Sequence, residues 1–521
     1  MRLSLRGVLL LCVSVAALSA CGSDRTIATV DAGTPISKAD AGRADSGTPA
    51  SDAGVPDAGT ADGGTADAGV LTPATITGVP ITGPRRGPIL LHFKIVDPDR
   101  TLTNVRLELE KGGQWVAATG HWDGPLTSPL LVVWWSFTDI ATDHMVTVRL
   151  IGSSLGTDVF GTIDLDVRNE PETDRIVLTG HKMGYTSDGG VTANNRTVSA
   201  QRWAKSSFVG APVDYSVGVG PGTLKAAPHG RAIVTVEEGK GTISIVTLPL
   251  SADPTQLHVL GAVPLPGDSA ADAHWSPDGR YLYIITQTKP AFVYRVEPSE
   301  DLLTMAAPEI LATLPGPPSR FAVEPTTGRI LVTCGPGNTT GLTKIVLYAP
   351  DGKELSRIEE DIDFTNAMAF HPAGGLALWL AEFSGDEVRR FRTDAAGKLA
   401  EDSVLKTVRA PQDVVFHPAS TVEAGAALVT SGYTDALTPL TLTATMMSSG
   451  TPVKKVPLAE EMDLIERGSQ SGLVFVSAVT AIFKAQLSVT GQVSGLASVF
   501  DFDPSPDAPP EKIITGLAVQ R

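Results

Sequence analysis

The sequence predicts an all-β chain in which a β-propeller follows a smaller β-sandwich and a disordered N-terminal tether. Three observations support this prediction. Residues 171–521 repeat a strand–turn–strand pattern every 46 to 49 residues, residues 76–170 alternate short apolar runs with turn residues, and residues 21–75 contain few large apolar side chains. Repeats of roughly 40 to 50 residues with four strands each are typical of propeller blades.

The first 20 residues have the features of an export signal. Arg2 and Arg6 precede an apolar run from Val8 to Leu18, and the run ends in Leu18-Ser19-Ala20-Cys21. This ending resembles the lipobox of bacterial lipoprotein precursors, which implies cleavage before Cys21 and acylation of its thiol. An ordinary signal peptide or an uncleaved anchor is the alternative, but the run is shorter than the roughly 20 residues that span a bilayer.

Residues 21–75 are expected to form a disordered linker. They repeat Asp-Ala-Gly or a close variant, with Thr, Pro and Ala between the repeats. Such a composition offers too little apolar surface to offset the entropy of ordering the chain. A calcium-binding repeat is the alternative, but the Gly-Gly-x-Gly-x-Asp pattern is missing. Gly22 follows the lipidated cysteine, and resemblance to Gram-negative lipoproteins therefore implies transport to the outer membrane, with the periplasmic or surface side left open.

Residues 76–170 are predicted to form an immunoglobulin-like or fibronectin-like sandwich. Turn sequences such as Asp97-Pro98-Asp99 separate its expected strands. Trp134 and Trp135 point to opposite faces of one strand, so one of them should be in the core. The other could be a ligand platform or a contact with the next domain. The expected strands are 89–96, 105–109, 115–118, 130–137, 145–151 and 162–167.

Residues 171–521 are predicted to form the propeller. Prolines mark the turn after the first strand of successive repeats, at Pro228, Pro277, Pro325, Pro372 and Pro418. Two weaker copies, Met462–Glu466 and Leu517–Gln520, bring the number of inner strands to seven. The last copy has no residues after it to complete its blade, so segment 175–218 should supply the remaining strands and close the ring. Six blades with a frayed end are the alternative.

The blade sequence from Asp272 to Ile284, DAHWSPDGRYLYI, resembles the YVTN and lactonase-like propellers of bacteria. The resemblance covers about residues 220–521, and its motif is structural. It implies the fold and leaves the chemistry open, because such rings serve lactone hydrolysis, isomerisation and plain binding alike.

Equivalent blade positions lie on a ring around the propeller axis, so residues far apart in sequence can meet there. The position five residues before each turn proline holds Thr223, Asp272, Arg320, Ala367 and Asp413. We expect these residues at the channel mouth, with Arg320 able to pair with a ligand carboxylate. An ion pair between Asp272 and Arg320 that only joins neighbouring blades is the alternative. The candidate ligand-binding set is Asp272, Arg320, Asn366, Asp413, Glu237, Gln287 and Glu382, with Ser319, Gln412 and Asp463 nearby.

The sequence offers no pattern that indicates a metal site, a cofactor or a catalytic set. The nine histidines are scattered, and no His-x-x-x-His, Cys-x-x-Cys or Gly-x-Ser-x-Gly motif occurs. His371 and His417 each precede a blade proline, which predicts a shared role in the turn. Cys334 lies in a strand-like run and is expected to be a buried, inert thiol without a disulfide partner.

The net charge of the chain limits the kinds of molecule that it can bind. The formal net charge of −16 argues against nucleic acid, because phosphate backbones would repel the protein. The function expected from these features is that of an envelope-anchored lipoprotein that acts, without catalysing a reaction, as a binding or scaffold module for a protein, peptide or glycan. A lactonase-like hydrolase or isomerase with its site at the channel mouth is the alternative.

Overall fold

The computed structural model describes residues 71–521 with internal gaps. The gaps are residues 86–87, 123–125, 127, 141–143, 169–173, 184–196, 219–220, 229, 238–241, 250–251, 266–268, 299–301, 303, 336–341, 361–364, 375–377, 383–385, 407, 422–423, 432–435, 444–445, 455, 457–458, 466–470, 479 and 503–511. The predicted signal peptide, Cys21 and nearly all of the predicted linker therefore lie outside the described residues. Within the described residues, no helix has both the length and the apolar character needed to cross a bilayer.

Two sheets formed by residues 75–167 pack into a sandwich. One sheet has the order β1-β3-β7-β6 and the other β2-β9-β8-β4-β5. The strands are β1 (Thr75–Gly78), β2 (Pro84–Arg85), β3 (Pro88–Val96), β4 (Leu102–Lys111), β5 (Gln114–Ala117), β6 (Gly120–His121), β7 (Leu130–Trp135), β8 (His144–Ser154) and β9 (Thr157–Val167).

Both sheets contribute to the sandwich core. Leu91 and Trp134 from one sheet join Leu109, Val148 and Leu165 from the other in a single buried cluster. Trp134 is the core tryptophan, and its indole Nε1 donates to the Asp139 carboxylate at 2.7 Å. The Trp135 side chain lies outside the described residues. The strand expected over 130–137 is shorter, because the short helix α2 (Ser136–Asp139) begins at Ser136.

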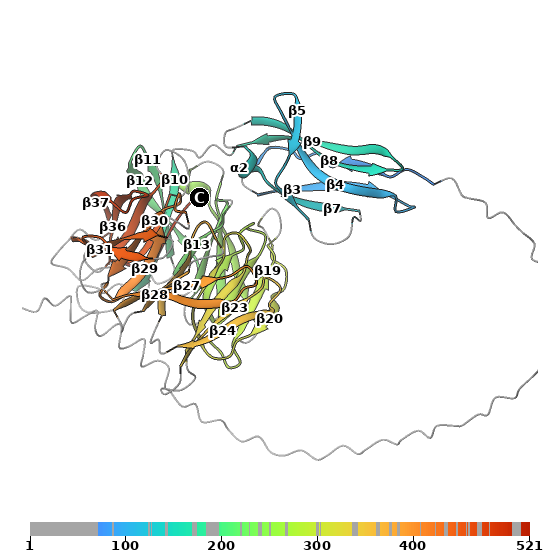
Figure 1. Ribbon diagram of the computed structural model, residues 1–521. Helices are drawn as coiled ribbons and strands as arrows, with labels where there is room; N and C mark the ends of the chain where they lie inside the picture. Colours follow the sequence, from blue (N-terminus) through green and yellow to red (C-terminus); the bar gives the residue numbers. More distant parts are fainter. Residues whose placement is uncertain are drawn as a thin grey trace, which may run out of the picture. The chain divides into compact units, whose positions relative to one another are not determined.

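Seven sheets in the described part of residues 175–519 form the propeller (Figure 1). We call each sheet a blade and name it after its inner strand. The inner strands are β13 (Pro221–Ala226), β17 (Ala270–Trp275), β21 (Pro318–Val323), β25 (Thr365–Phe370), β29 (Pro411–Phe416), β34 (Ala459–Leu464) and β38 (Lys512–Val519). Each inner strand contacts the next, and β38 contacts β13, which closes the ring. The predicted all-β propeller fold is confirmed.

The outer strands pair antiparallel in chain order within each blade. The second strands are β14 (Ala232–Glu237), β18 (Leu282–Thr286), β22 (Ile330–Cys334), β26 (Leu378–Glu382), β30 (Ala424–Ser431) and β35 (Leu473–Ala478). The third strands are β15 (Thr242–Thr247), β19 (Phe292–Val296), β23 (Thr343–Tyr348), β27 (Glu387–Thr393), β31 (Ala436–Thr443) and β36 (Ala481–Leu487). The outermost strands are β16 (His258–Pro264), β20 (Glu309–Thr313), β24 (Glu354–Glu360), β28 (Leu399–Leu405), β32 (Met447–Ser449) with β33 (Val453–Lys454), and β37 (Val493–Asp501).

The β38 blade combines strands from distant parts of the sequence. Its inner strand pairs antiparallel with β10 (Arg175–Met183), which is followed outward by β11 (Thr197–Ala204) and β12 (Ser207–Ser216). Val177 faces Val519 and Thr179 faces Leu517 in this register, and the Gln520 amide donates to the Ile176 carbonyl at 2.9 Å. Segment 175–218 thus supplies three strands of this blade, as the sequence predicts. Strand β38 begins five residues earlier than expected.

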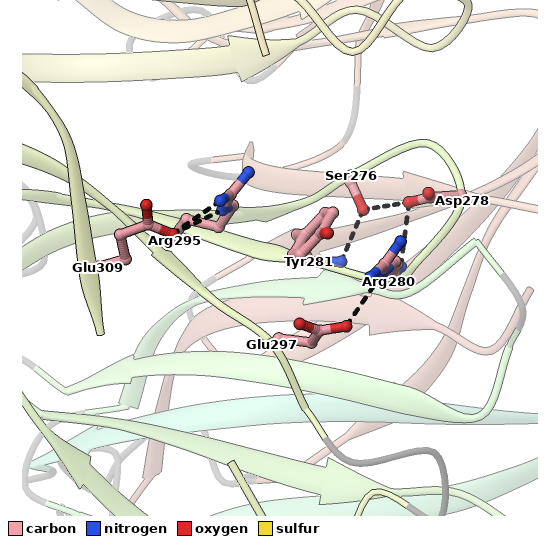
Figure 2. A network of polar contacts seen from close by, with 7 residues as sticks. All are labelled: Ser276, Asp278, Arg280, Tyr281, Arg295, Glu297 and Glu309. Atoms are coloured by element: carbon pink, nitrogen blue, oxygen red, sulfur yellow. Dashed lines mark hydrogen bonds and ion pairs between the residues drawn. The ribbon is translucent and has the colours of Figure 1, made fainter. Parts of the chain in front are cut away.

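The Ser-Pro-Asp-Gly sequence of the β17 blade forms the turn between its first two strands (Figure 2). The Ser276 hydroxyl donates to the Asp278 carboxylate and accepts the Tyr281 amide at 2.8 Å. The Arg280 amide donates to Asp278 Oδ1 at 3.0 Å, and Gly279 takes a φ of 68°, which favours glycine. The motif that carries the family resemblance therefore has a structural role here.

Candidate functional site

Three of the inner strands share the same pattern of burial. In β17, β25 and β29, only the second and fifth residues are partly exposed, and the other four are buried. A β-bulge at the second residue of the strand explains this odd spacing, because strict alternation would not place residues three apart on one face. The second position holds Asn366 and Gln412, and the fifth holds His274 in β17.

Two of the aspartates expected at the mouth are buried at junctions between blades. Asp272 is 2% exposed and Asp413 is 8% exposed. Asp413 Oδ1 accepts the amide of Val414 at 2.8 Å, while its Oδ2 accepts the amide of Met462, in the next blade, at 2.7 Å. Asp272 accepts the amides of Ala273 and of Phe321, which is also in the next blade. Each carboxylate thus joins two inner strands.

The same device recurs at Asp463, whose carboxylate accepts the Leu464 amide at 2.9 Å and the Val519 amide at 2.7 Å. Its Oδ1 also lies 2.9 Å from the Arg521 guanidinium. Asp463 therefore joins the β34 blade to the β38 blade.

Arg320 and Asn366 continue the series of contacts between blades. Arg320 Nε donates to the Asn366 carbonyl at 2.7 Å, and Asn366 Nδ2 donates to the Pro411 carbonyl at 2.9 Å. Arg320 also donates to the Ser319 carbonyl at 3.1 Å. These contacts differ from the simple Asp272–Arg320 ion pair considered above: both residues bond to backbone groups, and the Arg320 charge acts on Asp272 at longer range.

Two further side chains complete the set. Thr515 Oγ1 donates to the Pro221 carbonyl at 2.7 Å, and Trp275 Nε1 donates to the Lys225 carbonyl at 3.1 Å. All seven junctions between neighbouring inner strands therefore carry a hydrogen bond from a side chain to the backbone of the adjacent blade. We call this set the inter-blade girdle: Asp272, Trp275, Arg320, Asn366, Asp413, Asp463 and Thr515.

Positive charge gathers around His274 and Asp272. Burial raises the pKa of the Asp272 carboxyl, and the charges of Arg320 and Lys225 partly offset this. Burial holds the pKa of His274 well below 6.5, and the charges of Lys225 and Arg320 lower it further. His274 is therefore a neutral imidazole at pH 7, with two cations close enough to influence it.

Lys225 is the residue that the sequence analysis missed. It lies three residues before the turn proline of its blade, as His274 does in the next blade. A comparison of the residues three before each turn proline would have placed Lys225 and His274 at the same level of the ring.

The three acidic or amide residues at the ends of second strands have different environments. Glu237 is 1% exposed, and its carboxylate accepts the Gly218 amide at 2.9 Å and the hydroxyls of Thr242 and Ser244. Gln287 is exposed. Glu382 ends β26, but its side chain lies outside the described residues. Of these three, the structure therefore describes only Glu237 and Gln287, one buried and one exposed.

His371 and His417 have the shared turn role that their position predicts. Each Nδ1 accepts the amide two residues later at 3.2 Å, from Ala373 and from Ala419 respectively. Within the described residues, no three His, Cys, Asp or Glu side chains gather as a metal site would require.

Comparisons with known proteins identify the fold. No family model matches the chain, and no curated protein sequence matches it. A protein from Bacteroides fragilis, described as a candidate 6-phosphogluconolactonase, is 14% identical over 67% of this chain and 99% of its own, with a TM-score of 0.50. The periplasmic gluconolactonase of Pseudomonas aeruginosa is 15% identical over 66% of this chain and 99% of its own, with a TM-score of 0.48. At such identities the likeness concerns the fold alone, which is a lactonase-like β-propeller.

Proposed function

We propose that this protein is a lipid-anchored envelope protein whose propeller binds a ligand at the mouth of the ring without hydrolysing it. The lipobox-like Leu18-Ser19-Ala20-Cys21 supports the anchor. The observation that supports binding over hydrolysis is the inter-blade girdle. Asp272, Asp413 and Asp463 each accept two backbone amides, so their carboxylates are committed to holding the ring together.

The ligand we propose is a protein, peptide or glycan that presents a carboxylate. Ser319, Asn366 and Gln412 are partly exposed at the start of three adjacent inner strands. Lys225 on β13 and Arg320 on β21 add two positive charges on the blades that flank the β17 blade, and a carboxylate is the group that pairs best with a guanidinium. Amide and hydroxyl side chains around two cations suit recognition of a polar, anionic end group.

A lactonase-like hydrolase or isomerase is the second candidate, and one observation favours it. His274 is neutral and lies near two cations. A neutral imidazole can act as a general base, and cations can stabilise the negative charge that develops on a lactone carbonyl.

A lactone panel and a capture experiment from intact envelopes, both with the full chain, separate the two candidates. We expect no turnover of any lactone, and we expect capture of a partner that Lys225→Met and Arg320→Ala weaken by about 2 kcal/mol or more. Thr515→Val is the matched control, because it removes one girdle contact of similar geometry without changing charge. Lactone turnover that His274→Gln abolishes would establish the enzyme instead.

A further inference from the structure

A cluster of charges between the β25 and β29 blades has more positive than negative groups. Arg390 and Arg392 lie two residues apart on β27, so their side chains share one face of the blade. Both guanidiniums pair with the same carboxylate, that of Asp402 on β28, and the distance from Arg392 Nε is 2.8 Å. Two cations therefore share one anion, and the face has a net positive charge in a protein whose total charge is −16.

Arg390 is buried in this cluster and only partly satisfied. It is 2% exposed. Its Nη1 donates to the carbonyls of Thr443 at 3.1 Å and Met446 at 3.5 Å, both in the β29 blade. Its Nε has no acceptor among the described residues. An unpaired donor on a buried guanidinium costs free energy unless an acceptor is supplied.

A second buried polar atom without a described hydrogen-bond partner lies on β28, opposite Arg390. Ser403 faces Arg390 in the register of β27 with β28, and directly opposite residues project from the same face of a sheet, about 5 Å apart. The Ser403 hydroxyl is buried and has no partner among the described residues. A β-bulge lies next to this pair, so no residue of β27 lies directly opposite Asp402. The Asp402 carboxylate nevertheless forms ion pairs with Arg390 and Arg392.

The charges on the opposite face of the same strands are balanced. Arg389 pairs with Glu387 at 2.8 Å and with Glu401 at 2.9 Å, and Lys406 pairs with Glu387. The excess positive charge therefore belongs to the face that carries Arg390, Arg392 and Ser403.

We propose that Arg390, Arg392 and Ser403 form a binding site for a small oxyanion at the boundary between the β25 and β29 blades. An oxygen of a carboxylate, sulfate or phosphate group would accept hydrogen bonds from Arg390 Nε and from the Ser403 hydroxyl. Because Asp402 neutralises only one of the two guanidiniums, the other would balance the charge of the bound anion. Arg392 and Asp402 are partly exposed, which gives an anion access from solvent. This site is separate from the proposed ligand site at the ring mouth.

Isothermal titration calorimetry of the full chain at pH 7 and constant ionic strength tests this site, with sulfate, phosphate and acetate as probes. We expect saturable binding of at least one probe with one site per chain. Acetate binding would indicate a carboxylate-bearing ligand, and binding of sulfate or phosphate alone would indicate a tetrahedral anion. Both results support an oxyanion site.

Three variants locate the binding. Ser403→Ala should weaken it about 5-fold or more, because it removes a hydrogen bond to the anion, and Arg392→Gln about 10-fold or more, because it removes the excess positive charge of the cluster. Arg295→Gln is the matched control on β19, where one arginine meets one carboxylate, Glu309, at 2.7 Å, and it should change nothing. Arg320→Ala should also leave this binding intact.

Several results would overturn the proposal. No saturable heat with any probe would mean that a water molecule satisfies Arg390 and Ser403. Equal binding by wild type and Ser403→Ala would mean an adventitious ion only. Binding lost in Arg320→Ala but kept in Ser403→Ala would place the anion at the ring mouth.

Discussion

Asp413 accepts a hydrogen bond of 2.7 Å from the backbone amide of Met462, on the inner strand of the next blade. The contact joins inner strands that are not hydrogen-bonded to each other as a sheet. Apolar side chains also pack between the blades, but these contacts are less directional than a hydrogen bond. A directional bond at each junction fixes the register of one blade against the next.

Asp413→Ala should destabilise the propeller by about 2–4 kcal/mol, because it leaves the buried amides of Val414 and Met462 without an acceptor. Glu359→Ala, an exposed change on the outermost strand β24, is the control and should stay within about 0.5 kcal/mol of wild type. Chemical denaturation measures both. Equal stability of the two variants would show that the girdle does not hold the blades.

Deleting residues 516–521 should lower the thermal midpoint of the whole propeller instead of fraying one edge. The deletion removes the partners of Val177, Leu178 and Thr179 on β10, and it exposes an inner strand edge. Arg521→Gln, which removes side-chain contacts such as those with Asp463 and Leu464 but keeps the strand, should cost much less. Calorimetry compares them, and an unchanged midpoint in the deletion variant would show that β38 does not close the ring.

His371 should make the protein less stable on the acid side. Burial lowers its pKa to about 4, against 6.5 for an ordinary histidine, and a backbone hydrogen bond at Thr421 only partly offsets the effect. Between these values the unfolded chain binds the proton and the folded chain does not, so stability falls as the pH drops from 6.5 to 4. His371→Gln should flatten this part of the curve. Gln287→Asn, an exposed change that alters no titratable group, is the control and should leave the slope as it is in wild type. An identical slope in all three proteins would contradict the assignment.

Cys334 should be unreactive in the folded protein. It is fully buried, and burial raises the pKa of its thiol to about 12, so almost no thiolate exists at pH 8. With Cys12 and Cys21 replaced by Ser, a disulfide reagent such as Ellman's should label no thiol in the native state and one thiol in guanidinium. Rapid stoichiometric labelling of the native protein would show that the thiol is accessible.

The sequence determined the architecture of this protein because turn chemistry is local. Ser276, Asp278 and Gly279 form their turn with one another, so the spacing of such turns revealed the blades before any contact was known. The pairing of segment 175–218 with the last inner strand also followed, since an unfinished blade must find strands elsewhere.

Only the tertiary structure decided what the residues at equivalent positions of the inner strands do. The sequence placed Asp272, Arg320 and Asp413 at one level, but a β-bulge in each inner strand turned both aspartates into the wall, where they bond to the next blade. A bulge leaves little trace in one sequence, because it depends on how two strands pair. The same holds for Arg390 and Ser403: their shared face exists only through the register of β27 with β28 and the approach of the neighbouring blade.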